Sequence, residues 1–120
     1  MANLQQLTSL EQWEQALQGT STSGKPLLVF KHSTSCPISA GAHEEFTKYI
    51  EDAVDGAVDF TLVRVIEERP VSNAIAESLG VKHASPQAIL VKDGQAVWND
   101  SHWRITYAAL SEHVGTPKHS

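Results

Sequence analysis

The spacing between apolar residues changes along the chain, and near its start this spacing is that of a helix. Leu10, Trp13 and Leu17 recur at the spacing that places side chains on one face of a helix. The sequence Ser-Leu-Glu-Gln at positions 9–12 predicts a capping box, because the serine can accept a hydrogen bond from the backbone three residues on while the glutamine reaches back. Polar residues 20–24 then predict a connector that is too short to separate domains.

Two strand-and-helix units follow this connector. Residues 27–30 form a compact apolar run, which predicts a strand buried on both faces. A long helix is expected from about residue 36 towards residue 54, because Phe46, Ile50 and Val54 recur four positions apart. Residues 60–66 predict a second strand. Residues 70–79 predict a helix that a proline starts and a glycine ends.

The last unit is a hairpin followed by a helix. Residues 88–92 and 95–98 flank Asp93 and Gly94, and an Asp-Gly pair supplies the positive φ angles of a tight type I′ turn. A final helix is expected over residues 106–110. The first two strands should pair in parallel through a right-handed crossover, whereas the hairpin strands are antiparallel. This order predicts an α/β, thioredoxin-like arrangement: a mixed central sheet of about four strands with helices on both faces.

Composition limits the class of protein. A length of 120 residues predicts a single domain over residues 1–120. With 41% hydrophobic and 19% charged residues, the chain is not expected to be disordered. A formal net charge of −5 disfavours binding to nucleic acid or anionic lipid, because both need a basic surface. We see neither a secretion signal nor a run long enough to span a membrane, so we expect a soluble, cytoplasmic protein with no nucleic-acid or membrane partner.

The sharpest chemical signal is the single cysteine, Cys36, between the first predicted strand and the long helix. Ser35 is the expected N-cap, which would place Cys36 and Pro37 at the first helical positions. Unpaired amides and the positive end of the helix dipole favour a thiolate there, so we expect a lowered thiol pKa. Ser39 is expected on the same face, where its hydroxyl could donate to the sulfur. Such a thiolate suits thiol–disulfide exchange.

The alternative interpretation is that a lone cysteine is a small buried hydrophobe. The surrounding hydroxyls and the following proline favour the reactive interpretation. A second segment, His-Ala-Ser-Pro-Gln at positions 83–87, immediately precedes the hairpin. From sequence alone the bond between Ser85 and Pro86 would be assigned as trans, because only about 5–6% of X-Pro bonds are cis. The segment could equally be an ordinary strand-entry turn.

Several segments together resemble the monothiol bacilliredoxins, the YtxJ-like proteins of bacteria that use bacillithiol. They are Lys31-His32-Ser33, Cys36-Pro37-Ile38-Ser39, Glu44-Glu45-Phe46, residues 81–88 and Trp98-Asn99. The resemblance spans about residues 8–112 and includes two motifs in the right order. It implies a thioredoxin fold, a catalytic Cys36, and a cis-proline at Pro86 beside the sulfur. It also implies that Ser39 occupies the position of the resolving cysteine in a dithiol site.

The resemblance implies a monothiol cycle that removes bacillithiol from protein mixed disulfides. The expected catalytic residues are Cys36 and Ser39, and the expected substrate-binding residues are Ser35, Pro37, Ser85 and Pro86. The implied partners are bacillithiolated client proteins and a low-molecular-weight thiol. Bacillithiol would be the thiol co-substrate, with no tightly bound cofactor and a role under oxidative stress.

Other functions stay open at this point. The six histidines lack the spacing of a metal site, so we expect no metal. His32 and His83 could lie near the sulfur, where a protonated imidazole would favour the thiolate. Cys36 could instead form a sulfenic acid in a peroxide sensor or peroxidase, which peroxide consumption would reveal. It could also be inert in a non-enzymatic thioredoxin-like binding module, which slow alkylation at about pH 6 would indicate.

Overall fold

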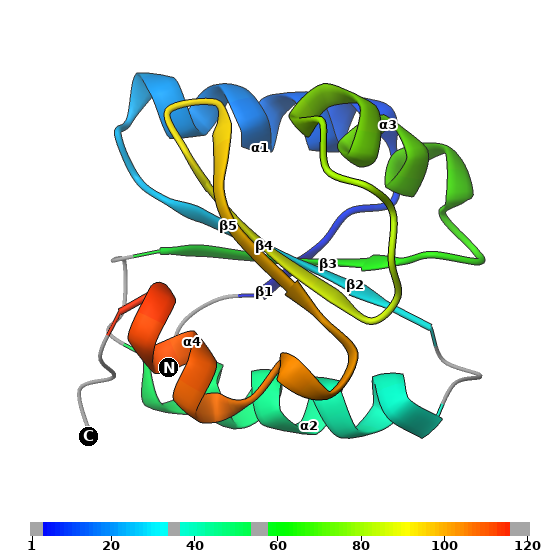
Figure 1. Cartoon of the computed structure of the whole chain (residues 1–120). Helices are drawn as coiled ribbons and strands as arrows, with labels where there is room; N and C mark the ends of the chain where they lie inside the picture. Colours follow the sequence, from blue (N-terminus) through cyan, green and yellow to red (C-terminus); the bar gives the residue numbers. More distant parts are fainter. Residues whose placement is uncertain (1–3, 34–36, 54–57, 116–120) are drawn as a thin grey trace.

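A five-stranded mixed sheet separates two layers of helices in the computed structural model (Figure 1), which describes residues 4–33, 37–53 and 58–115. The elements are β1 (Leu4–Gln6), α1 (Leu10–Thr22), β2 (Leu27–His32), α2 (Pro37–Asp52), β3 (Asp59–Arg64), α3 (Arg69–Leu79), β4 (Gln87–Lys92), β5 (Gln95–Ser101), the 3-10 helix η1 (His102–Arg104) and α4 (Tyr107–His113). The strand order is β1-β3-β2-β4-β5. β1, β3 and β2 are parallel, and β4 and β5 are each antiparallel to the strand before them in this order. The predicted mixed α/β sheet is confirmed.

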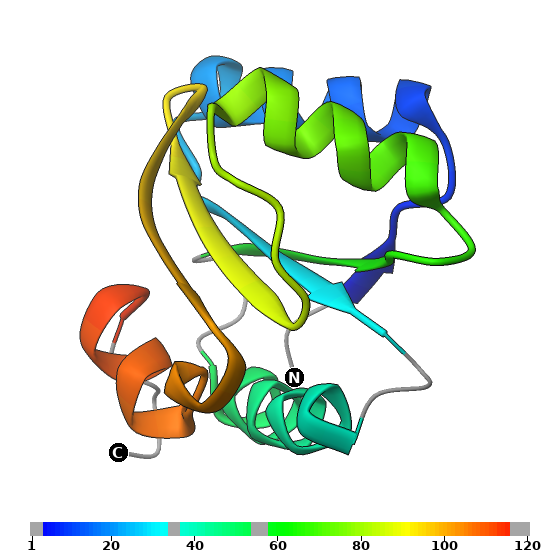
Figure 2. The same ribbon diagram turned by 45° about the vertical axis from the view of Figure 1, so that its right-hand side comes forward.

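Each face of the sheet carries its own apolar core, because side chains alternate along a strand. Helices α2 and α4 cover one face, and α1 and α3 cover the other (Figures 1 and 2). The core under α2 and α4 includes Leu28, Phe30, Phe46, Ile50, Leu90 and Leu110. The core under α1 and α3 includes Trp13, Leu27, Val29, Val71, Ile75 and Ile89. The central strand β2 is therefore buried on both faces, as predicted.

The first helix begins at the predicted cap but differs from it in one contact. The Ser9 hydroxyl accepts from the Gln12 N–H (3.2 Å). The Gln12 side chain reaches back one residue further than in a standard capping box and accepts from the Thr8 N–H (2.7 Å). Leu10, expected on the buried face, is 48% exposed, whereas Trp13 is buried.

The expected polar connector at 20–24 is wrong for its first three residues, because α1 continues to Thr22 and the connection to β2 starts at Ser23. Thr20 is buried, and its hydroxyl donates to the Leu17 carbonyl (2.6 Å). The same oxygen accepts from the Gly94 N–H (2.8 Å). The Leu17 contact satisfies the hydroxyl proton inside α1, and the Gly94 contact links the last turn of α1 to the β4–β5 turn.

The predicted turns are confirmed by their backbone angles. Asp93 and Gly94 have φ values of 51° and 77°, and Gly80 ends α3 with a φ of 65°. The second predicted strand is shorter than expected: β3 stops at Arg64, whose carbonyl accepts from the Glu68 N–H (2.7 Å) in a turn. The predicted ends of the long helix, at residues 36 and 54, lie outside the described residues. Within the part of the chain that the structure describes, no helix is long and apolar enough to span a membrane.

Candidate active site

The carboxyl ends of β2 and β3 lie at the same edge of the sheet, because the two strands are parallel. β2 ends at His32, whose carbonyl accepts from the Val65 N–H (3.0 Å) just after β3. α2 begins at Pro37, which is exposed. Ser35 and Cys36 lie outside the described residues, so their roles stay predictions. The described residues on both sides of them form the candidate site.

Ser39 joins the start of α2 to the end of β2. Its side chain is fully buried, and its hydroxyl oxygen accepts from the Ser33 N–H (2.9 Å). The same oxygen lies 2.7 Å from His32 Nδ1. A hydroxyl has one proton and two acceptor positions, so it can satisfy both contacts at once. Ser39 therefore ties together the two flanks of Cys36, and its predicted donation to the sulfur stays a prediction.

Burial keeps the His32 imidazole uncharged. The pKa of His32 is lowered mainly by burial and also by the charge of His43, while Glu67 acts in the opposite direction. The His32 ring stacks on His43 with ring centroids 4.6 Å apart, and on Phe30 at 5.8 Å. A histidine with a lowered pKa is neutral at neutral pH. This direction opposes the hypothesis that a protonated His32 favours the thiolate.

Residues 83–86, which precede β4 and which we name the proline loop, lie next to the end of β2. The bond between Ser85 and Pro86 is cis, as the resemblance implied. Lys31 pairs with Gln87 across β2 and β4, and one step further along both strands brings Pro86 beside His32. The Ser85 Oγ is buried and has no hydrogen-bond partner among the described residues. A buried hydroxyl without a partner is unfavourable, and the expected role of Ser85 in substrate binding stays a prediction.

Sequence reasoning missed a polar cluster around a buried lysine on the α3 side of β2. Lys31 is fully buried, and its Nζ donates to the Ser72 carbonyl (3.1 Å) and to His83 Nδ1 (3.2 Å). Burial lowers the pKa of Lys31 to about 8. The pKa of His83 is also lowered, first by burial and then by the charges of Lys31 and Arg69. His83 is thus neutral like His32, and the hypothesis of a protonated imidazole is not supported at either position.

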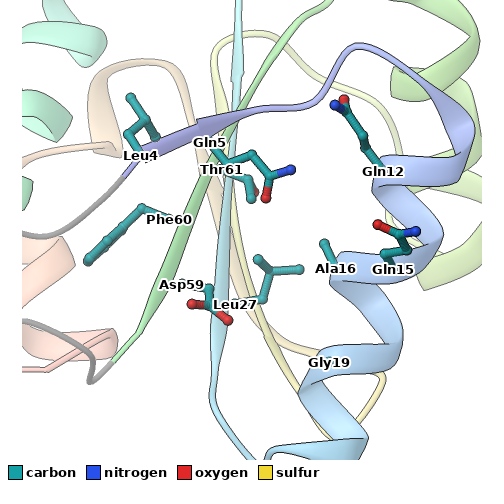
Figure 3. A pocket seen from close by; sticks show the side chains of 10 residues that line it. All are labelled: Leu4, Gln5, Gln12, Gln15, Ala16, Gly19, Leu27, Asp59, Phe60 and Thr61. Carbon is teal, nitrogen blue, oxygen red and sulfur yellow. The ribbon is translucent and has the colours of Figure 1, made fainter.

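A different hollow lies at the opposite edge of the sheet. Figure 3 shows it between α1 and the strands β1, β2 and β3, near their amino ends, and its volume is about 340 Å³. Of the described residues that line it, only Asp59 is ionisable, and its carboxylate pairs with the Lys25 Nζ (3.0 Å). This hollow offers neither a thiol nor an imidazole, so the candidate chemistry belongs to the edge near Ser39 and Pro86.

Comparison with known proteins gives the family. Residues 5–110 match the family model described as monothiol bacilliredoxin BrxC. A solved structure described as a candidate oxidoreductase with a thioredoxin fold is 36% identical, with a TM-score of 0.78 over 91% of this chain and 91% of that chain. Thioredoxin from Fasciola hepatica is 17% identical, with a TM-score of 0.72 over 92% of this chain and 95% of its own. Wild-type thioredoxin h from poplar is 20% identical, with a TM-score of 0.74 over 94% of each chain.

The two thioredoxins are distant in sequence and establish the fold alone. The nearly full-length family match, together with the 36% identical oxidoreductase, adds the chemistry of a thiol–disulfide oxidoreductase. The chain therefore belongs to the monothiol bacilliredoxin family.

Proposed function

We propose that this protein removes bacillithiol from protein mixed disulfides through thiol exchange at Cys36. The observation that carries the proposal is the buried serine at position 39 of a family member with one cysteine. A dithiol enzyme would have its second cysteine there and would release its substrate by closing an internal disulfide. This chain has no second thiol, so Cys36 must keep the transferred group until another thiol removes it.

The exchange balances without any other reactant. The Cys36 thiolate attacks the bacillithiol sulfur of the mixed disulfide, and the client sulfur leaves as a thiolate that takes up a proton. A disulfide between Cys36 and bacillithiol replaces the one that broke. A low-molecular-weight thiol then attacks this disulfide, takes the bacillithiol as a new disulfide and returns Cys36 as a thiolate. The client is reduced, and the external thiol is oxidised.

The long helix that follows Cys36 supports the thiolate. α2 has 16 residues, and the first turn of this described helix contains no acidic side chain that would offset its positive end. A thiol next to such a helix end has a lowered pKa. Because His32 and His83 are neutral, the helix end and not an imidazolium is the source of positive potential in this proposal.

The proline loop supports substrate docking on the other side of β2. Pro86 is buried beside the end of β2, and Ser85 carries the buried hydroxyl that has no partner among the described residues. The proposal assigns these two residues to the bound mixed disulfide, together with Ser35 and Pro37. The cycle needs a supply of low-molecular-weight thiol, which fits the expected cytoplasmic location.

Incubation of the purified protein with a bacillithiolated model protein tests the proposal. Mass spectrometry of both partners should find the client reduced and one bacillithiol on Cys36. The Cys36→Ala variant should leave the client modified. Client reduction by Cys36→Ala, or turnover of the wild type with no adduct at Cys36, would contradict the scheme.

A further inference from the structure

A cavity of about 390 Å³ lies beside the candidate site, and we name it the α3 cavity. Its lining residues are Val65, Ile66, Arg69, Ser72, Asn73 and His83. The Val65 N–H donates to the carbonyl of His32, the last residue of β2. His83 stands two residues before Ser85 in the proline loop. The α3 cavity therefore adjoins the strand end that leads into Cys36.

The α3 cavity is cationic on a protein with a net charge of −5. Arg69 lines it, and among the described residues Arg69 forms no ion pair. The two acids that precede Arg69 in the chain contact Arg64 instead, Glu68 at 2.9 Å and Glu67 at 3.8 Å, and the charge of Glu67 also acts on His32. None of the described lining residues is acidic. The positive charge of Arg69 is thus left for a ligand.

A second cation stands behind the cavity wall. Lys31 Nζ is fully buried and contacts the His83 Nδ1 and the Ser72 carbonyl, and both of these residues line the cavity. An ammonium group can only donate, so Nδ1 of His83 accepts and the ring proton is carried by Nε2. Lys31 therefore fixes His83 as a donor. A buried charge also acts over a longer range than an exposed one, because the interior screens it less.

We propose that the α3 cavity binds a carboxylate of the small thiol or disulfide that reacts at Cys36. The inference rests on the proposed function and adds a recognition site to it. The Arg69 guanidinium can hold a carboxylate through two parallel hydrogen bonds, and the His83 N–H can supply a further donor. Val65 and Ile66 provide an apolar wall for the carbon chain between carboxylate and sulfur. The volume is within the range of ordinary small-molecule sites.

Three symmetric disulfides of similar length but different charge test this site. They are 3,3′-dithiodipropionate (anionic), 2-hydroxyethyl disulfide (neutral) and cystamine (cationic). With each, the Cys36 thiolate attacks one sulfur, the disulfide bond breaks, one half leaves as a thiolate and the other half stays on Cys36. The rate is followed by mass spectrometry at low salt. The neutral reagent reports on the thiol and the fold alone.

The Arg69→Gln variant should react about tenfold more slowly with the anionic disulfide, since a charge-assisted hydrogen bond is worth about one order of magnitude. It should react with the neutral disulfide at the wild-type rate and with cystamine no more slowly. The control is Lys92→Gln, which removes one exposed positive charge at the β4–β5 turn and should change none of the rates.

Two results would overturn the inference while leaving the proposed function intact. One is an anionic rate that Arg69→Gln does not change, and the other is an equal loss with the anionic and neutral reagents. A wild-type protein that reacts with none of the three disulfides would instead overturn the proposed function.

Discussion

His32 Nδ1 lies 2.7 Å from Ser39 Oγ, and this contact joins the last residue of β2 to the first turn of α2. The same oxygen accepts from the Ser33 N–H. Cys36 stands between the joined residues in the chain. A serine in the place of a resolving cysteine therefore has a structural role of its own, since it links the two elements that flank the thiol.

Replacing Ser39 with alanine should destabilise the protein. The variant removes the acceptor of the Ser33 N–H and the partner of His32 in a buried place, which costs about 1–3 kcal/mol. Urea denaturation should show this as a lower midpoint. The control is Thr47→Ala on the exposed side of α2, where the hydroxyl donates only to the His43 carbonyl and its loss should cost less than about 0.5 kcal/mol. Equal losses in the two variants would show that the Ser39 contacts do not stabilise the fold.

Replacing Ser39 with cysteine should convert the monothiol site into a dithiol site. Residues 36 and 39 have the spacing of a Cys-x-x-Cys motif at the start of a helix, so the new thiol can attack a mixed disulfide on Cys36. The bound group should then leave, and an internal disulfide should take its place. Mass spectrometry after reaction with 2-hydroxyethyl disulfide should find the adduct on the wild type. On Ser39→Cys it should find neither an adduct nor a free thiol. A stable adduct on the variant would mean that the two positions do not face each other.

The parts of the fold that sequence could predict have local signals. The apolar run of β2, the Asp93-Gly94 turn and the Gly80 stop each act within a few residues, and the structure has all three. β1 has no such signal: its three residues are exposed, and they form a strand only because they pair with β3, far along the chain. Long-range pairing of a short polar edge strand leaves no pattern in its own residues.

The polar groups around the site were harder to predict for the same reason. A lysine after four apolar residues looks like the point where a strand emerges into solvent. Lys31 is instead buried, because Ser72 and His83, both distant in sequence, supply its hydrogen-bond acceptors. Strand alternation was the available signal, since it places Lys31 on the same face as Leu27 and Val29, which lie in the core under α1 and α3.

The buried Lys31 should make stability depend on pH. Burial lowers its pKa to about 8 from the ordinary value of 10.5, so the unfolded chain holds more protons on this lysine between these two values. The free energy of unfolding must therefore rise with pH in that window, and the full cost of burying the charge is present below about pH 7. In the Lys31→Met variant this rise is absent. Between pH 7 and pH 9 the free energy of unfolding of the wild type should rise by about 1 kcal/mol relative to that of the variant.

Urea denaturation of both proteins across this pH range measures the difference and cancels the other titrating groups. Lys92→Met is the matched control, because Lys92 is an exposed lysine in the same sheet. Its stability should follow the wild type at every pH. If the curves of Lys31→Met and wild type also run parallel, Lys31 titrates as an ordinary exposed lysine and the buried charge is not supported.

Replacing Ser85 with alanine should separate binding from stability. The Ser85 Oγ is buried without a partner among the described residues, so its removal should leave the free energy of unfolding unchanged or slightly higher. The Ser111 hydroxyl in α4 is equally buried and has no partner in the described part of the chain, so Ser111→Ala should have the same effect on stability. Only Ser85→Ala should lower kcat/KM with a bacillithiolated protein, by about three- to tenfold for one lost hydrogen bond. Equal activity in the two variants would remove the Ser85 side chain from the substrate site.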